Sequence, residues 1–180
     1  MSYLVLKEHS SSSYSPRTSE NANAADLTAA FAIDFTTAGE RCTHKAAGNK
    51  YLALWIKGEV IPNARNLYSY CKKLKVKELN IAGNGIYTLN EKGWSQSQVN
   101  QYVYETLKLV HQHYPIQKIR SGGQTGVDIA GLVAAVELGI DAVGLFPKGF
   151  IQRSINKIDV SKDKDTLYQE ILNFTQELDK

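Results

Sequence analysis

The chain has 180 residues, of which 43% are hydrophobic and 22% are charged, and its net charge at pH 7 is +3. This length predicts one domain, residues 1–180, that buries its own core without cross-links. The small net charge disfavours a nucleic-acid partner. The densest basic stretch is typical of a solvated helix end, where cations favour the helix dipole; it comprises Lys72, Lys73, Lys75 and Lys77.

The cysteine pattern and the hydrophobic pattern indicate a cellular compartment. Cys42 and Cys71 lie far apart and form no C-x-x-C motif, so we expect neither a disulfide framework nor a cysteine metal site. No basic-then-apolar leader is present, and no apolar run approaches the roughly 18 residues that span a bilayer. We therefore expect a cytoplasmic protein without a membrane partner.

The first half of the chain alternates strands and helices. Residues 3–6 are expected to form an edge strand, and the serine-rich residues 10–15 a mobile loop. The apolar residues 27–35 indicate a buried strand, and residues 41–47 are compatible with a helix. Further expected elements are a strand over 51–56, a helix over 64–74 and a strand over 78–82.

The clearest predicted helix begins after Ser95, whose hydroxyl can cap it while Gln98 reaches back in a capping box. Apolar residues then recur at helical spacing until Pro115. The remaining expected elements are strands over 118–121 and 142–146 and helices over 127–138 and 165–178. Strands separated by helices predict an α/β, Rossmann-like open sheet that is mostly parallel and covered by helices on both faces.

A glycine-rich turn joins a predicted strand directly to a predicted helix: Ser121-Gly122-Gly123-Gln124-Thr125-Gly126. This turn predicts an anion site, because backbone N–H groups and the positive end of a helix dipole meet there. The side chains of Gln124 and Thr125 can donate further hydrogen bonds. Asp128 would repel a phosphate placed directly on it, so it suits either a helix cap or an acceptor for sugar hydroxyls. Alternatively, the glycines serve only a tight turn that Asp128 caps.

Other turns are expected to converge on the same edge of the sheet, because ligands of open parallel sheets bind outside the carboxyl ends of the strands. Candidate ligand contacts there are Thr37, Gly39 and Asn84, together with Lys148, which either neutralises a phosphate or is an exposed loop lysine. Neither G-x-G-x-x-G nor G-x-x-x-x-G-K-[ST] occurs, which disfavours a conventional NAD-dependent dehydrogenase and a P-loop NTPase. No histidine or cysteine spacing indicates a metal.

Three blocks of sequence carry a family resemblance. Ser121-Gly-Gly-Gln-Thr-Gly-Val-Asp128, followed by an alanine-rich segment and Pro147-Lys-Gly149, resembles the molybdenum carrier family, a YpsA-related group of the SMF/DprA/LOG (SLOG) superfamily. The segment Tyr14-x-x-Arg17-Thr18-x-x-Asn21 and the strand Leu79-Asn-Ile-Ala-Gly83 resemble two further blocks of that family. The glycine block comes last here and first in the family, which indicates a circular permutation.

The resemblance implies a nucleotide-type ligand. It places the site at Gly122, Gly123, Gln124, Thr125, Gly126 and Asp128, with rim contacts at Arg17, Asn21, Thr37, Gly39 and Lys148. Arg17 is the residue that we most expect to pair with phosphate. No cofactor is expected.

The resemblance leaves three functions open, since a fold does not determine function. The first is a non-catalytic binder that sequesters an ADP-ribose-type cyclic nucleotide immune signal, as a phage anti-defence sponge would. The second is a nucleotide N-glycosidase similar to LOG-type phosphoribohydrolases, in which Glu40 could act. The third is carriage of molybdenum cofactor. Self-association would use helix faces, where an apolar patch is expected from the side chains of Tyr68, Tyr70, Tyr102 and Tyr104.

Overall fold

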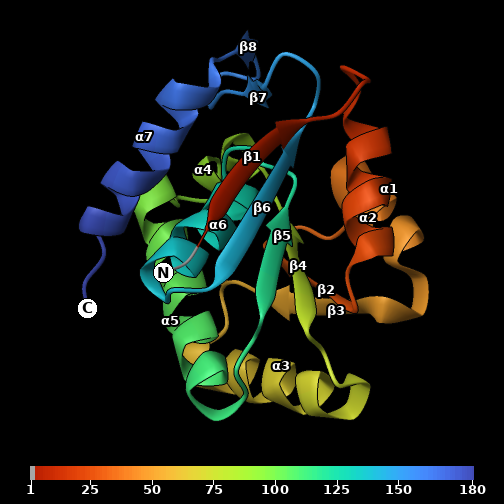
Figure 1. Ribbon diagram of the computed structural model, residues 1–180, viewed down its shortest axis with the longest axis vertical. Helices are drawn as coiled ribbons and strands as arrows, with labels where there is room; N and C mark the ends of the chain where they lie inside the picture. The colour runs from red at the N-terminus through yellow and green to blue at the C-terminus, as the bar shows by residue number, and fades with distance from the viewer. Residues whose placement is uncertain (1–2) are drawn as a thin grey trace.

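The structure is a computed structural model that describes residues 3–180, and its centre is a six-stranded parallel sheet (Figure 1). The strand order is β1-β6-β5-β4-β2-β3, and every neighbouring pair is parallel. The strands are β1 (Leu4–Glu8), β2 (Leu27–Ala32), β3 (Tyr51–Trp55), β4 (Glu78–Gly83), β5 (Lys118–Ser121) and β6 (Asp141–Phe146). The prediction of a Rossmann-like parallel sheet is confirmed.

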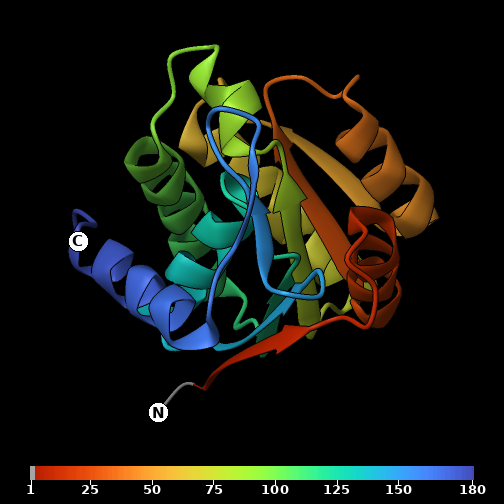
Figure 2. The ribbon, with the colours of Figure 1, turned by 90° about the horizontal axis from the view of Figure 1, so that it is seen from above.

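Helices cover both faces of this sheet, as predicted. Seen from above, α1 (Tyr14–Ala24) and α2 (Ala38–Ala47) lie on one side and the green-to-blue helices on the other (Figure 2). These green-to-blue helices are α5 (Gln96–His113), α6 (Val127–Glu137) and α7 (Lys164–Gln176), and the yellow α3 (Val60–Leu74) packs against α5. The short elements are the 3-10 turn η1 (Gly48–Lys50) and helix α4 (Ile86–Asn90).

The core lies between the sheet and these two helical layers. All six residues of β2 are buried, because helices cover both of its faces. On the other side, α5 buries Val99, Val103 and Leu107 along one face. The predicted capping box at its start is confirmed: the Gln98 amide N–H donates to Ser95 Oγ, and the Ser95 N–H donates to Gln98 Oε1.

The structure corrects the predicted boundaries of two elements. Strand β2 ends at Ala32 and not at residue 35, because Asn84 Oδ1 accepts hydrogen bonds from the backbone N–H groups of Ile33 and Asp34 and replaces the strand ladder there. The predicted loop 10–15 is too long, since its last two residues begin α1. Helix α1 escaped prediction because its sequence YSPRTSENANA is polar and has no apolar stripe.

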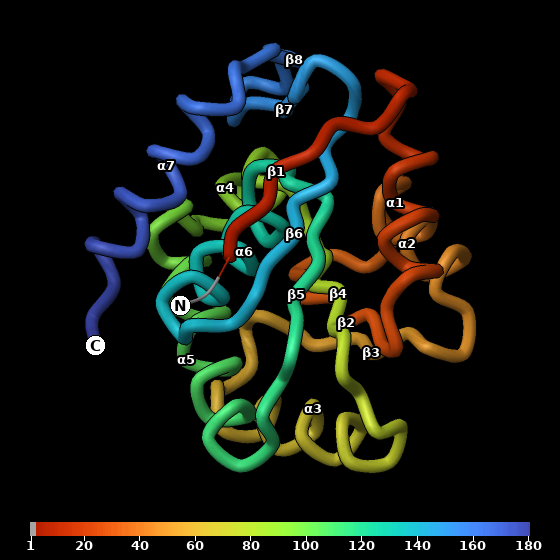
Figure 3. The backbone as a smooth tube through the Cα atoms, in the orientation of Figure 1, coloured from red at the N-terminus to blue at the C-terminus, as the bar shows by residue number. Residues whose placement is uncertain are grey.

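A second, smaller sheet was also not predicted. It is an antiparallel hairpin of β7 (Ile151–Arg153) and β8 (Asp159–Ser161), two strands of three residues each. Along the traced chain it lies between β6 and α7, beyond the upper end of the main sheet (Figure 3). Within residues 3–180, none of the helices combines the length and hydrophobicity needed to cross a bilayer.

Candidate functional site

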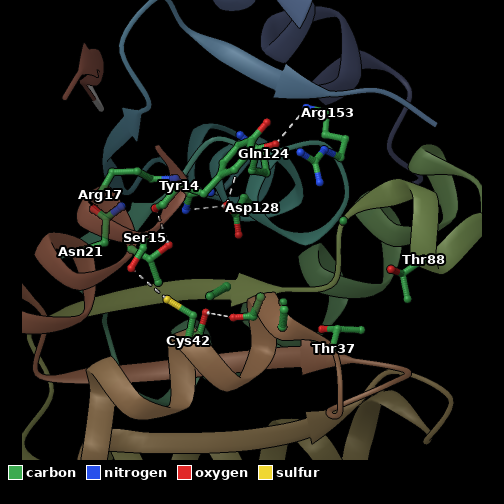
Figure 4. A pocket seen from close by; sticks show the side chains of 18 of the residues that line it. Tyr14, Ser15, Arg17, Asn21, Thr37, Cys42, Thr88, Gln124, Asp128 and Arg153 are labelled. Atoms are coloured by element: carbon green, nitrogen blue, oxygen red, sulfur yellow. Dashed lines mark hydrogen bonds and ion pairs between the residues drawn. The ribbon is translucent and has the colours of Figure 1, made fainter. Parts of the chain in front are cut away.

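A cavity of about 470 Å³ opens at the carboxyl ends of the central strands, between the sheet, α1 and α2 (Figure 4). Its size falls within the roughly 300–1,000 Å³ typical of small-molecule sites. Five parts of the chain that are distant in sequence line it: α1, the start of α2, the end of β4 with α4, the glycine turn and β7. Its lining residues among those predicted for the site are Arg17, Asn21, Thr37, Gly39, Gly122, Gln124 and Asp128.

One wall of the cavity carries a buried ion pair. Arg17 Nη1 lies 3.5 Å from Asp128 Oδ2, and both side chains are less than a tenth exposed. Burial raises the pKa of Asp128 above its usual value, while the Arg17 charge and the Gln124 N–H act in the opposite direction. Arg17 therefore meets a carboxylate inside the protein, where the sequence predicted that it would meet a phosphate.

Three buried polar atoms around the cavity have no hydrogen-bond partner within the described residues: Arg17 Nε, Asn21 Nδ2 and Asn80 Oδ1. The other ends of the two amides are fixed, because Asn21 Oδ1 accepts from Arg120 Nε and Asn80 Nδ2 donates to Thr28 Oγ1. Buried polar groups in proteins nearly always have a partner, and each exception needs an explanation. The two donors and the acceptor belong to residues that line one cavity, which makes this cavity the candidate site for a polar ligand.

The start of α2 supplies free backbone donors. Thr37 caps this helix, and its hydroxyl accepts from the Glu40 N–H. The first two amides of the helix belong to Ala38 and Gly39, which line the cavity, and they have no acceptor in the part of the chain described. Unsatisfied N–H groups at the positive end of a helix dipole favour an anion.

The glycine turn uses some of its backbone donors inside the protein. Gly123 donates to Ser121 Oγ, Gln124 to Asp128 Oδ2 and Gly126 to Gln96 Oε1, while the N–H groups of Gly122 and Thr125 have no acceptor in the part of the chain described. Asp128 thus accepts from the turn as an anion would, but it does not cap α6, whose N-cap residue is Gly126. In this arrangement, open backbone amides line the cavity at the start of α2 and at Gly122.

The glycines of this turn are explained by packing inside the protein. A methyl group at Gly122 would overlap the Arg17 guanidinium and lie 2.7 Å from Asp128 Oδ2. Gly123 and Gly126 have φ values of +74° and +93°, which favour glycine, and a side chain at either would overlap neighbouring atoms. Only Gly122 of the three lines the cavity.

The other predicted contacts lie outside the cavity lining. Asn84 is buried, and its amide holds the backbone after β2, with Nδ2 donating to the Asp34 carbonyl. The Thr125 hydroxyl donates to the Arg153 carbonyl. Lys148 is exposed on the loop after β6, in agreement with the alternative of a surface lysine.

Sequence reasoning missed the aromatic and cationic side chains at the cavity mouth. Arg153 comes from the unpredicted hairpin, and Tyr14 and Tyr87 from helices that were also unpredicted. No signal in the sequence pointed to Arg153, because a long-range contact places it: the Gln124 amide donates to the Ile151 carbonyl and accepts from the Arg153 N–H, and so ties β7 to the glycine turn.

A buried carboxylic acid lies behind the start of α2. Glu40 is only 2% exposed, and its Oε2 accepts a hydrogen bond of 3.1 Å from the Tyr51 hydroxyl. Burial raises the pKa of Glu40 to about 7; the hydrogen bond from Tyr51 lowers it and the charge of Asp128 raises it. Glu40 is not among the residues that line the cavity.

Comparison with known proteins identifies a family for this chain. A sequence model of the circularly permutated YpsA SLOG family matches residues 1–107 and 119–157, which is most of the chain. No curated protein and no solved structure matches the chain. The matched segments include α1, the start of α2, the glycine turn and Arg153. The chain therefore belongs to the circularly permuted YpsA family of the SLOG superfamily.

Proposed function

We propose that this protein binds a phosphate-bearing, nucleotide-derived ligand of the ADP-ribose type in the cavity between α1 and α2. Membership of the SLOG family supports a nucleotide-related binding or glycosidase-like role in general. The observation that carries the proposal is the set of three unpartnered buried atoms, on Arg17, Asn21 and Asn80, beside the free amides at the start of α2. A nucleotide offers both the phosphate and the sugar or base groups that would satisfy them.

We further propose that the ligand is held and not cleaved. The carboxylate that lines the cavity, Asp128, is committed to Arg17 and to the Gln124 N–H. Glu40 lies behind the cavity and is engaged by Tyr51. A site with strong binding groups and no free acid or base suits sequestration, as in a sponge for an immune signal.

Gly39→Asp tests the location of the phosphate. A side chain at Gly39 would meet no atom within 4 Å, and an acidic residue in the first turn favours a helix, so the variant should fold normally. Its charge would nevertheless lie at the proposed anion site. Ile61→Asp is the matched control, because Ile61 is also the second residue of a helix, is 55% exposed and lies outside the cavity lining.

The experiment measures binding of AMP, ADP-ribose, cyclic ADP-ribose and NAD by calorimetry, followed by chromatography of the recovered ligand. We expect tight binding of one compound, its recovery intact, and a loss of at least tenfold in affinity in Gly39→Asp but not in Ile61→Asp. Equal affinity in all three proteins would refute the location.

Nucleotide hydrolysis is the second candidate, and one observation favours it. The pKa of about 7 at Glu40 suits a general acid, and the charge of Asp128 contributes to it. This function predicts release of free base or ribose phosphate during the same incubation, and loss of that release in Glu40→Gln. Intact ligand after prolonged incubation with catalytic amounts of protein would exclude it.

A further inference from the structure

Guanidinium groups and tyrosine rings alternate along the mouth of the cavity. The Arg17 and Arg153 guanidinium carbons lie over the Tyr14 ring, 5.7 Å and 5.3 Å from its centre. Arg153 also lies over Tyr87, 6.0 Å from that ring centre. All four side chains line the cavity, and Arg17, Tyr14 and Arg153 are seen along its upper side in Figure 4. The mouth therefore presents flat, electron-rich and cationic surfaces.

Arg153 is held in this position by several contacts. Asp159 on β8 accepts two hydrogen bonds from its guanidinium, at 2.8 Å and 3.1 Å. The same carboxylate accepts from the Tyr14 hydroxyl at 2.7 Å, which joins the hairpin to α1. Gln124 and Thr125 of the glycine turn bind the backbone of Arg153. A guanidinium fixed in advance loses little freedom when a ligand stacks on it.

A glycine, Gly85, lies directly beside the Tyr87 ring. Gly85 has a φ of −68°, which any residue adopts, so this glycine is not needed for chain conformation. A methyl group there would lie 2.5 Å from Tyr87 Cε1. Gly85 thus leaves the space that the Tyr87 ring occupies beside the cavity.

We infer that Tyr87 and Arg153 form the nucleobase subsite of the cavity, so that the ligand carries a planar base at the mouth and its phosphate at the start of α2. This inference rests on the proposed function. Aromatic rings and guanidinium planes stack on any base, and the sugar and phosphate groups have no such face. The ligand class is therefore a nucleotide with its base attached, and not a sugar phosphate.

The test compares AMP with ribose 5-phosphate by calorimetry, because the two share the sugar and phosphate and differ in the base. We expect wild-type protein to bind AMP at least tenfold more tightly. Tyr87→Leu should lose most of that difference and leave ribose 5-phosphate affinity unchanged, while Tyr87→Phe, which keeps the ring, should retain it. Gly85→Ala should act as Tyr87→Leu does. Tyr168→Leu, at a tyrosine on α7 that is 41% exposed, is the control.

If wild-type protein binds another nucleotide and not AMP, that nucleotide and its base-free counterpart take the place of the pair, and the outcomes below apply to them. If neither compound binds wild-type protein and no other nucleotide does, the proposed function fails and this inference with it. If ribose 5-phosphate binds as tightly as AMP, or if Tyr87→Leu weakens both equally, the proposed function stands and the base subsite is refuted. Circular dichroism of each variant excludes loss of fold as the cause.

Discussion

Replacing Glu40 with glutamine should stabilise the protein, and by an amount that depends on pH. Glu40 is 2% exposed, and burial raises the pKa of its carboxyl group to about 7. Glutamine has nearly the same shape, and its oxygen can still accept the 3.1 Å hydrogen bond from Tyr51. The substitution therefore removes the ionisation and keeps the packing.

The sign and size follow from proton linkage. The ordinary pKa of 4.5, taken for the unfolded chain, is lower than the folded value of about 7, so the unfolded state releases its proton first. Below pH 4.5 both states are protonated and Glu40 costs nothing. Between pH 4.5 and pH 7 the free energy of unfolding falls, and above pH 7 the full cost of about 3 kcal/mol is present, at 1.36 kcal/mol per pKa unit.

Urea denaturation followed by circular dichroism at pH 4, 5.5, 7 and 8 measures this difference. Glu40→Gln and wild-type protein should unfold alike at pH 4, and the variant should be more stable by about 3 kcal/mol at pH 8. Glu59→Gln, at an exposed glutamate, is the control. A difference that stays constant with pH, or greater stability of wild-type protein at pH 8, would refute a buried Glu40 with a raised pKa.

Three further predictions concern the cavity and the backbone beside it. Gly122→Ala should lower the free energy of unfolding by about 1–3 kcal/mol, because its methyl group overlaps the Arg17 guanidinium and Asp128 Oδ2, and it should cost less when added to Arg17→Ala, which removes the larger overlap; additive losses in urea denaturation would contradict this. Asn84→Ala should cost about 1–3 kcal/mol by leaving two partly buried backbone N–H groups, those of Ile33 and Asp34, without their acceptor; a loss below about 0.5 kcal/mol would show that water replaces the amide. Iodoacetamide should alkylate Cys42, which lines the cavity, but not the buried Cys71, and saturating nucleotide should slow the reaction; an unchanged rate would place the ligand elsewhere.

Local patterns in the sequence determined most of the main sheet and its covering helices. Period-two and period-3.6 hydrophobicity, the capping box at Ser95 and the glycine stops are features of a few adjacent residues, so they can be recognised without a structure. The three quoted sequence blocks placed the chain in its family. The local patterns could not reveal α1, because its polar sequence resembles that of a loop. Arg17 and Asn21 on this helix are buried through contacts with distant strands and helices.

The tertiary structure alone decided what each site residue does. Arg17 and Asp128 are 111 residues apart, so no local pattern could show that their charges neutralise each other. Gly126 and Gln96 are 30 residues apart, so none could show that the Gln96 side chain accepts the Gly126 N–H of the turn. The same holds for Arg153, which reaches the cavity because Gln124 pairs with its backbone. The sequence by itself predicted a site at the carboxyl ends of the strands, where the structure has a cavity. Which atoms remain free to bind a ligand depended on long-range hydrogen bonds that form only when the chain folds.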